Sequence, residues 1–193
     1  MSLFYHMERF PAPHKVRMSH FWTIKNTYTG NLEAKILLLN SNPGFYKGTV
    51  LGDDYFQKTS RANLRHTKQE YPFYLFDPKN RASFGYLWWS RKLKPLIALY
   101  GLHKIAHEIF NVEYFTYYSA KFSGNIIVPS QSYSFYLVEE AMKRNALIIQ
   151  MRRKKVWQEG VPGLMSYHNY YVLKNPQNPA ISQRIVQMDF QKF

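Results

Sequence analysis

The sequence predicts an α/β fold of three layers, in which a central, mostly parallel four-stranded sheet lies between helices. Stretches rich in strand-forming residues alternate along the chain with stretches of helical spacing. This alternation is typical of parallel sheets that carry helices on both faces. The run KILLLN at residues 35–40 also lacks the polar–apolar alternation of a half-exposed strand, which indicates a strand buried on both faces.

The chain has 193 residues, which is long enough for one well-buried domain and short for two. We therefore expect one α/β domain over residues 1–193, with residues 1–34 as an N-terminal extension packed on it. Pro11 and Pro13 block a long early helix there. Residues 53–83 are polar, basic and interrupted by prolines, which predicts a long irregular segment of the kind that often carries function.

The remaining elements alternate. Residues 86–100 have helical spacing, with Pro95 expected to kink or divide the helix and Gly101 to end it before a short helix to residue 110. The other predicted elements are a strand at 112–119, a helix at 133–146 capped by Ser132 or Ser134, a strand at 146–151, a basic helix at 152–160, a strand at 169–174 and a closing helix from Ser182 to residue 193.

The charge is strongly one-sided, with 26 Lys and Arg against 12 Asp and Glu, a net charge of +14. Such a field attracts polyanions. Because 18% of the residues are aromatic, we expect DNA as the partner; a basic protein whose charge serves only solubility is the plain alternative. No basic amphipathic helix stands out in the sequence, and no apolar run is long enough to span a bilayer, so we expect no membrane partner.

The chain contains no cysteine, which excludes disulfides, a cysteine nucleophile and thiolate metal sites. His103 and His107 stand at helical spacing but lack the Glu and the third ligand of a zinc site. We expect no metal and no other cofactor. The N-terminal residues also lack the apolar core of a signal peptide, which fits a cytoplasmic protein.

Two loops of similar composition follow the first and last predicted strands: NSNPGF at residues 40–45 and NPQNPAIS at residues 175–182. Ligands of parallel sheets bind beyond the carboxyl ends of the strands, so we expect both loops, with residues 117–119, to line one crevice. The first loop has neither P-loop nor GxGxxG spacing. Read alone, Asn-Pro-Gly is a plain turn, and Ser182 is only an N-cap.

These two motifs, in this order on these strands, resemble those of the uracil-DNA glycosylase superfamily. In that family the first core strand ends in a water-activating loop. NSNPGF is similar to its Gly-Ile-Asn-Pro-Gly form, found in the mismatch-specific and thymine-DNA glycosylase branch. The last strand leads into an Asn-Pro-Ser-Gly-Leu-Ser type of loop, which NPQNPAIS resembles with extra residues. The resemblance covers most of the chain and implies a uracil-DNA-glycosylase-like fold.

The resemblance implies roles for the first loop. Asn42 matches the position that orients the attacking water, and an amide positions water without acting as a strong base. Gly44 stands where the strictest uracil enzymes carry a Tyr that excludes the thymine methyl group, which implies a relaxed choice of base. Ser41 and Pro43 belong to the same substrate-binding loop. Phe45 is placed to stack on an extruded base or to fill the core.

The resemblance also reaches the second loop. Asn175 or Asn178 matches its catalytic head, and Ser182 matches the closing Ser, a phosphate contact at a helix N-terminus. The family often reads the base with an Asn after the second strand. The matching stretch here, FTYYSAK, has none, and Tyr118 and Ser119 are the substitutes. The iron–sulfur cofactor of some family branches needs four cysteines and is excluded.

Two basic clusters are candidate DNA contacts, although either one also reads as a solvated helix face. They are Arg152, Arg153, Lys154 and Lys155, and, in the irregular segment, Arg61 and Arg65 with His66 and Lys68. The rings of YPFYLF at residues 71–76 offer surfaces for base stacking or fill the core.

The sequence thus predicts a DNA glycosylase that hydrolyses the N-glycosidic bond of uracil or another deaminated or mispaired base. Two alternatives stay open. One is a member of the same fold with degraded catalytic loops that binds nucleic acid without cutting it. The other is an enzyme that acts on a nucleoside or nucleotide in the same crevice.

Overall fold

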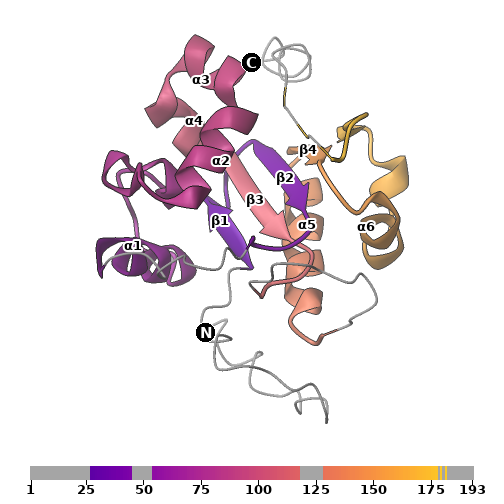
Figure 1. The fold of residues 1–193 in the computed structure, drawn as a ribbon. Coiled ribbons are helices and arrows are strands. Elements are labelled where there is room, and N and C mark those ends of the chain that lie inside the picture. Colours follow the sequence, from indigo (N-terminus) through magenta and orange to yellow (C-terminus); the bar gives the residue numbers. More distant parts are fainter. Residues whose placement is uncertain (1–26, 45–53, 118–127, 178, 180, 182–193) are drawn as a thin grey trace.

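The computed structural model describes residues 27–44, 54–117, 128–177, 179 and 181, which form an α/β fold around a five-stranded mixed sheet (Figure 1). The predicted α/β class is therefore confirmed. The strands are β1 (Tyr28–Gly30), β2 (Ile36–Asn40), β3 (Ile109–Glu113), β4 (Leu147–Gln150) and β5 (Tyr170–Val172). Their order across the sheet is β1-β3-β2-β4-β5.

The sheet differs from the prediction by one strand. Strands β3, β2, β4 and β5 run parallel to their neighbours, whereas β1 pairs antiparallel with β3 at the edge. In the centre Leu38 pairs with Asn111 on one side and with Ile149 on the other. Strand β1 comes from the segment that we expected to be an extension outside the sheet. Its three residues, YTG, are too few to give a periodic signal.

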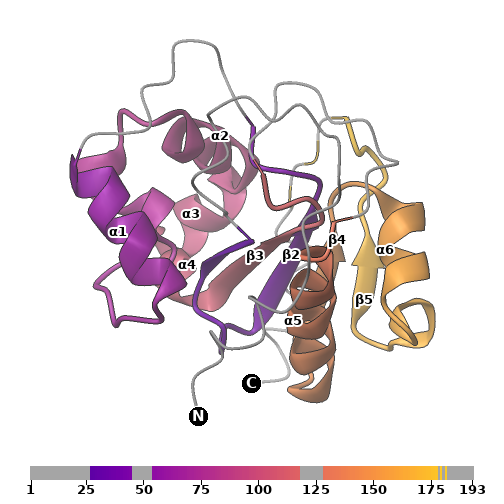
Figure 2. The same ribbon diagram turned by 90° about the horizontal axis from the view of Figure 1, so that it is seen from below.

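Helices cover both faces of the sheet (Figure 2). One face carries α1 (Asp54–Leu64), α2 (Phe84–Lys92), α3 (Lys94–Tyr100) and α4 (Leu102–Glu108), with 3-10 turns η2 (Tyr74–Phe76) and η3 (Pro78–Asn80). The other face carries α5 (Gln131–Lys143) and α6 (Lys154–Gly160), followed by the 3-10 turn η4 (Leu164–Ser166). None of the described helices is long and apolar enough to cross a bilayer.

Alternate residues of the buried strands enter two separate cores. On the α2–α4 face, Ile36 and Leu38 pack with Trp89, Leu96 and Ile105. On the α5–α6 face, the core consists of Leu37, Leu39, Phe110, Val138, Ala141 and Trp157, among others. The apolar run of β2 thus supplies both faces at once, which is the reason that it lacks alternation.

The division of the helix at residues 86–100 is confirmed. Helix α2 ends at Lys92, and α3 begins at Lys94 with Pro95 in its first turn, where proline costs no hydrogen bond. Gly101, with φ of 81°, separates α3 from α4.

The irregular segment predicted at residues 53–83 was wrong over its first third, because α1 is a helix. Its buried residues are Thr59, Ser60 and Asn63, so the inward face is polar and gives no apolar period. The strand predicted at 112–119 was also displaced: α4 ends at Glu108, and β3 begins at Ile109.

The cap predicted for the helix at 133–146 was wrong. Helix α5 begins at Gln131, and its N-cap residue Ser130 makes no side-chain capping bond. Ser134 instead donates from Oγ to the carbonyl of Glu113 at 2.8 Å, which ties the helix to the end of β3.

The free edge of β1 is covered by one side chain. Asn63 accepts from the amide of Gly30 through Oδ1 at 3.0 Å and donates from Nδ2 to the carbonyl of Tyr28 at 3.2 Å. The hydroxyl of Tyr28 donates in turn to the carbonyl of Asn63 at 2.9 Å. Asn63 therefore takes the donor and acceptor positions that a further strand would use.

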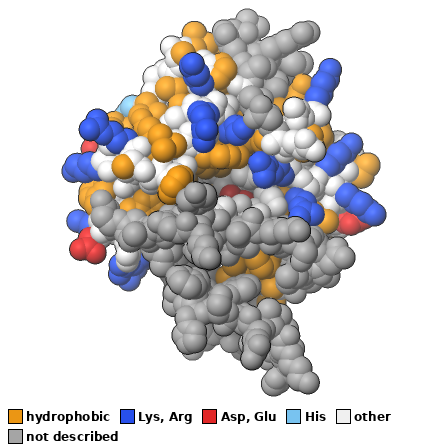
Figure 3. All heavy atoms as spheres, in the orientation of Figure 1, with side chains coloured by type: hydrophobic (Ala, Val, Ile, Leu, Met, Phe, Trp, Pro, Cys, Tyr) orange, Lys and Arg blue, Asp and Glu red, His pale blue; other side chains and the backbone are white. Residues whose placement is uncertain are grey.

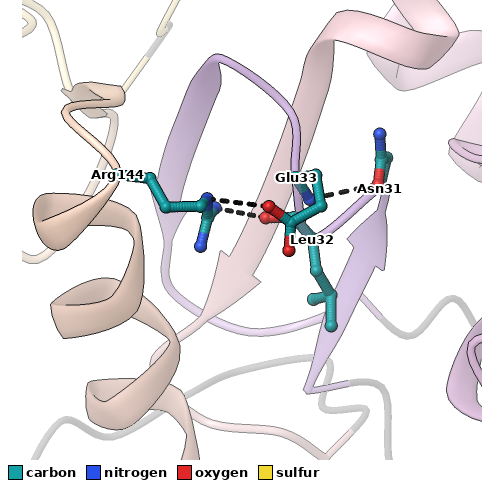
Figure 4. Close-up of polar contacts among 4 residues, drawn as sticks. All are labelled: Asn31, Leu32, Glu33 and Arg144. Carbon is teal, nitrogen blue, oxygen red and sulfur yellow. Dashed lines mark hydrogen bonds and ion pairs between the residues drawn. The ribbon is translucent and has the colours of Figure 1, made fainter.

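The connection from β1 to β2 is held by the end of α5 (Figure 4). Arg144 places Nε 3.5 Å from a carboxylate oxygen of Glu33 and donates from its guanidinium to the carbonyl of Leu32. Asn31 accepts from the amide of Glu33 at 3.1 Å. The ion pair is largely exposed, so its contribution to stability is small.

Gly30 is a position where only glycine fits. Its φ is +114°, and a Cβ there would lie 2.5 Å from the carbonyl oxygen of Ile109. We expect Gly30→Ala to cost more stability than Gly101→Ala, for which the backbone conformation alone (φ 81°, ψ 152°) costs about 1–3 kcal/mol. Gly101 is the matched control, because its φ is +81° and a Cβ added there would have no atom within 4 Å. Urea unfolding midpoints measure both; equal costs would contradict the packing argument.

Candidate functional site

The chain changes direction across the sheet between β2 and β4. From β2 it passes to α1–α4 and returns as β3 on one side, whereas from β4 it passes to α6 and returns as β5 on the other side. Open parallel sheets bind ligands at such a switch point, beyond the carboxyl ends of the strands. We call this region the carboxyl edge: residues 40–44, 113–117, 150–153 and 173–177.

Backbone hydrogen bonds fix the end of β2 at the carboxyl edge. The carbonyl of Leu39 accepts from the amides of Met151 at 2.9 Å and Arg152 at 3.3 Å. The carbonyl of Ser41 accepts from the amide of Phe115 at 2.8 Å. The segments after β3 and β4 therefore hold the loop that follows β2 from both sides.

The carbonyl of Asn40 has two donors, the amide of Tyr114 at 3.3 Å and the indole nitrogen of Trp157 at 2.9 Å. Trp157 lies on α6, is fully buried, and packs against Tyr114 and Phe135. One helix of the α5–α6 face thus anchors the last residue of the central strand.

The first predicted loop lies on this frame. Ser41 is buried, and its amide donates to Oδ1 of Asn40 at 3.0 Å. Asn42 is half-buried and donates from Nδ2 to the carbonyl of Pro43 at 3.0 Å. Gly44 is exposed, and no atom of the residues that the structure describes lies within 4 Å of the place where its Cβ would be. The backbone at Gly44 is therefore open to a ligand.

The second predicted loop runs from β5 back to α2. Asn175 is exposed, and its Oδ1 accepts from the amide of Gln177 at 3.1 Å, which forms a local turn. Farther along, buried Ile181 donates from its amide to the carbonyl of Lys92 at 3.1 Å. The loop thus borders the carboxyl edge. Four predicted site residues besides Phe45 lie outside the described residues: Tyr118, Ser119, Asn178 and Ser182.

Glu113 is a site residue that the sequence analysis missed. It ends β3 directly opposite Asn40 in the sheet register, and only 6% of its surface is exposed. Asn111, two residues earlier on the same face, donates to its Oε1 at 2.9 Å. The other carboxyl oxygen, Oε2, and Oδ1 of Asn111 have no hydrogen-bond partner among the described residues.

The carboxyl group of Glu113 is held near its titration point at neutral pH. Burial raises the pKa to about 7, and the hydrogen bond from Asn111 and the charge of Arg152 oppose that rise. Figure 3 shows acidic colour recessed in the middle of the face, with Lys and Arg side chains beside it. The signal in the sequence was an acidic residue at the end of a strand of buried residues. The aromatic-rich stretch that follows it, YFTYY, made the whole region look like an ordinary strand.

Arg152 and Arg153 are the members of the predicted basic run that lie at the carboxyl edge. The guanidinium of Arg152 lies 5.9 Å from the ring centre of Trp88 on α2, and its Nε is buried without a partner among the described residues. Arg153 adopts left-handed φ and ψ of 59° and 43° at the start of α6. Such backbone strain in a residue other than glycine is found most often at functional sites.

The other predicted basic residues lie elsewhere. Lys154 and Lys155 are exposed on α6, where Lys155 lies 3.8 Å from Glu159. Arg61 and Arg65 are exposed on and after α1, and α1 and α6 occupy opposite sides of the fold in both ribbon views (Figures 1 and 2). The two predicted clusters therefore do not form one surface.

The rings at residues 71–76 chiefly fill the core. Phe73, Tyr74 and Phe76 are fully buried under α2 and α4, so these three do not offer a stacking surface. Among the described residues, no group of three or more His, Asp or Glu side chains is placed to hold a metal ion. His107 takes the carbonyl of His103 as a partner at 3.0 Å.

Comparisons of the chain with models of known families, with curated proteins and with solved structures found no significant match. The function must therefore be inferred from the geometry of the carboxyl edge and from the sequence of its two loops.

Glu113 predicts a specific dependence of stability on pH. The folded pKa of about 7 exceeds the ordinary value of 4.5, so the folded state retains a proton that the unfolded chain has lost. Stability therefore falls as the pH rises through this interval, by about 3 kcal/mol in total. Glu113→Gln removes the titration, and its amide mimics the protonated acid beside Asn111. We expect it to unfold at higher urea than the wild type at pH 8, with a flatter pH profile.

The exposed carboxylate Glu70 supplies the matched control, Glu70→Gln, which should leave the profile unchanged. Urea midpoints at several pH values make the comparison. A Glu113→Gln profile that parallels the wild type would show that Glu113 is ionised throughout.

Proposed function

We propose that the protein is a DNA N-glycosylase, which hydrolyses the bond between deoxyribose and uracil or another deaminated or mispaired base. The observation that carries the proposal is the placement of the Asn42 loop: it ends the central strand β2 at the switch point of the sheet, directly beside the end of β3 with its buried acid Glu113. The resemblance of NSNPGF and NPQNPAIS to the uracil-DNA glycosylase loops supports the same function.

The open backbone at Gly44 suits the binding of a base outside the duplex. An enzyme that acts on the glycosidic bond must extrude the nucleotide, which costs a few kcal/mol and favours damaged or mispaired bases. Because no atom of the described residues stands within 4 Å of a Cβ at Gly44, we expect this part of the loop to admit a methylated pyrimidine as well as uracil. Relaxed base choice follows from this opening.

The proposed chemistry divides two tasks between two side chains. Asn42, held through its Nδ2 by the carbonyl of Pro43, positions a water near the anomeric carbon. Glu113 accepts a proton from that water, because its pKa of about 7 lets it act as a base at neutral pH. The water oxygen bonds to the anomeric carbon as the carbon–nitrogen bond breaks, and the electron pair leaves on the base nitrogen.

The departing base is an anion, and the carboxyl edge supplies positive charge for it. Arg152 and Arg153 follow β4 beside the Asn42 loop, and Asn175, on the side of β5, is the proposed amide donor; Asn178, the other predicted donor, lies outside the described residues. Fixed donors and cations directed at a developing negative charge commonly account for a large part of catalysis.

A single-uracil oligonucleotide tests the proposal. A fluorescent duplex with uracil opposite guanine is incubated with the protein at low salt and then treated with alkali, which cleaves abasic sites. We expect strand scission by the wild type and a loss of roughly 100-fold or more in Asn42→Ala, because the water loses its positioning group. Asn31→Ala is the matched control, since Asn31 lies after β1 at the amino end of the parallel strands. Binding without scission would instead identify a non-cutting nucleic-acid-binding protein, and neither binding nor scission would refute the DNA function.

The rate of that reaction should depend on Glu113. The carboxylate is the form that accepts a proton, so we expect the wild-type rate to rise with pH and level off above about pH 7, as the pKa of Glu113 requires. Glu113→Gln should lower the rate at pH 8 by roughly 100-fold, within the usual range of a lost general base, and abolish the inflection. Single-turnover rates across the pH range measure both effects. An unchanged inflection in Glu113→Gln would assign the proton transfer to another group.

A further inference from the structure

The chain between Asp77 and Glu108 contains no acidic residue. Its cations are Lys79, Arg81, Arg91, Lys92, Lys94 and Lys104. This stretch forms α2, α3 and most of α4, and Arg91 and Lys94 form no ion pair with any residue that the structure describes. The positive charge on this side of the protein is therefore not neutralised by carboxylates of the same segment.

The outer face of α2 is also apolar. Phe84, Leu87 and Trp88 stand at the i, i+3 and i+4 positions of one helix face, and Arg91 follows at i+7. Phe84 is 53% exposed and Leu87 47% exposed. Figure 3 shows hydrophobic side chains intermingled with Lys and Arg over this part of the molecule. A helix face that served only solubility would carry polar residues here.

Cations gather around the ring of Trp88. Lys92 lies 5.5 Å and Arg152 5.9 Å from its centre, within the range of cation–π attraction. Burial lowers the pKa of Lys92, and the neighbouring charges of Arg152 and Arg91 lower it further. Three cations that repel one another form a site where a bound anion would relieve the repulsion.

This surface is continuous with the carboxyl edge. Arg152 belongs to both, because it follows β4, lies over Trp88 and is close enough to Glu113 to act on its pKa. Ile181 bonds to the carbonyl of Lys92, so the second loop also borders α2. A polymer bound on α2 would lead directly to the proposed site.

We propose that Phe84, Leu87, Trp88, Arg91, Lys92 and Arg152 form a binding surface for single-stranded DNA next to the target nucleotide; we call it the α2 surface. The inference deepens the proposed function and rests on it for the identity of the polymer. Exposed rings stack on bases only when these are unpaired, and adjacent cations bind the phosphates, which is the usual design of single-strand sites. A neutral protein partner would leave the clustered cations unmatched. Because the surface is continuous with the carboxyl edge through Arg152, it favours a polymer that reaches the proposed site over a membrane.

Fluorescence anisotropy with a labelled, uracil-free oligothymidine tests the proposal. The variant Phe84→Ala/Arg91→Gln removes an exposed ring and an exposed cation of the α2 surface. We expect binding at least about 10-fold weaker than wild type, because a stacked base and a phosphate contact are both lost. The slope of log affinity against log salt should also fall by about 0.7, the value for one phosphate contact to a single strand.

The matched control removes a ring and a cation elsewhere. Tyr136 is 43% exposed on α5, and Lys58 is exposed on α1, so Tyr136→Ala/Lys58→Gln should bind as the wild type does. Equal loss in both variants would overturn the α2 surface as a single-strand site, and so would a loss of duplex binding in Phe84→Ala/Arg91→Gln larger than its loss of oligothymidine binding. Loss of a dimer in Phe84→Ala/Arg91→Gln by sedimentation would overturn it as well, by assigning the face to a second copy of the chain.

The scission assay separates this inference from the proposed function. Oligothymidine binding that depends on the α2 surface, without scission of any uracil substrate, would uphold the inference and refute the glycosylase. Scission of the uracil substrate, together with wild-type binding of oligothymidine by Phe84→Ala/Arg91→Gln, would uphold the glycosylase and refute the inference.

Discussion

Three consecutive backbone carbonyls at the end of β2 determine the shape of the carboxyl edge. Leu39 takes donors from the segment after β4, Asn40 takes Tyr114 and the indole of Trp157, and Ser41 takes Phe115. A strand that ends in small polar residues would otherwise fray, because its last carbonyl groups would form hydrogen bonds with water and not with the protein. Here the segments after the neighbouring strands and one helix donate hydrogen bonds to all three carbonyls. The turn at Asn42 therefore begins from a fixed point, and residues from three parts of the chain meet beside it.

The same frame places opposite charges in a confined space. Glu113 is buried at the end of β3. Arg152 lies in the connection that follows β4, where it is near both Glu113 and the ring of Trp88. Burial favours the neutral acid, whereas the cation and Asn111 favour the carboxylate. Burial outweighs the other two effects, so the pKa is about 7, and the acid and the carboxylate are about equally populated at neutral pH. A modest change nearby, such as the arrival of a phosphate at Arg152, would alter the protonation of Glu113, so the proposed binding on α2 and the proposed proton transfer at β3 would be electrostatically linked.

A segment could be predicted from the sequence when its buried residues are apolar, and was missed when they are polar. The run ILLLN was recognisable as a strand because both of its faces meet apolar cores, and Pro95 marked the break between α2 and α3. Helix α1 was missed, because it buries Thr59, Ser60 and Asn63 rather than apolar residues. The position of Asn42 after the central strand was predictable from the order of elements. Glu113 was not, since its importance comes from burial and from Arg152, which lies 39 positions later in the chain. The α2 surface also escaped notice, because rings and cations four residues apart are typical of many amphipathic helices.

Asn63 has a consequence beyond the packing of α1. Its amide group bonds both the Gly30 amide and the Tyr28 carbonyl on the outer side of β1. An exposed strand edge is a template on which another chain can add a strand, and proteins with uncovered edges are prone to aggregate through them. The proposed binding to DNA would bring many copies of this basic protein close together, where pairing of uncovered edges would lead to aggregation. One asparagine, from a helix with no apolar period, prevents β1 from pairing with a strand of another molecule.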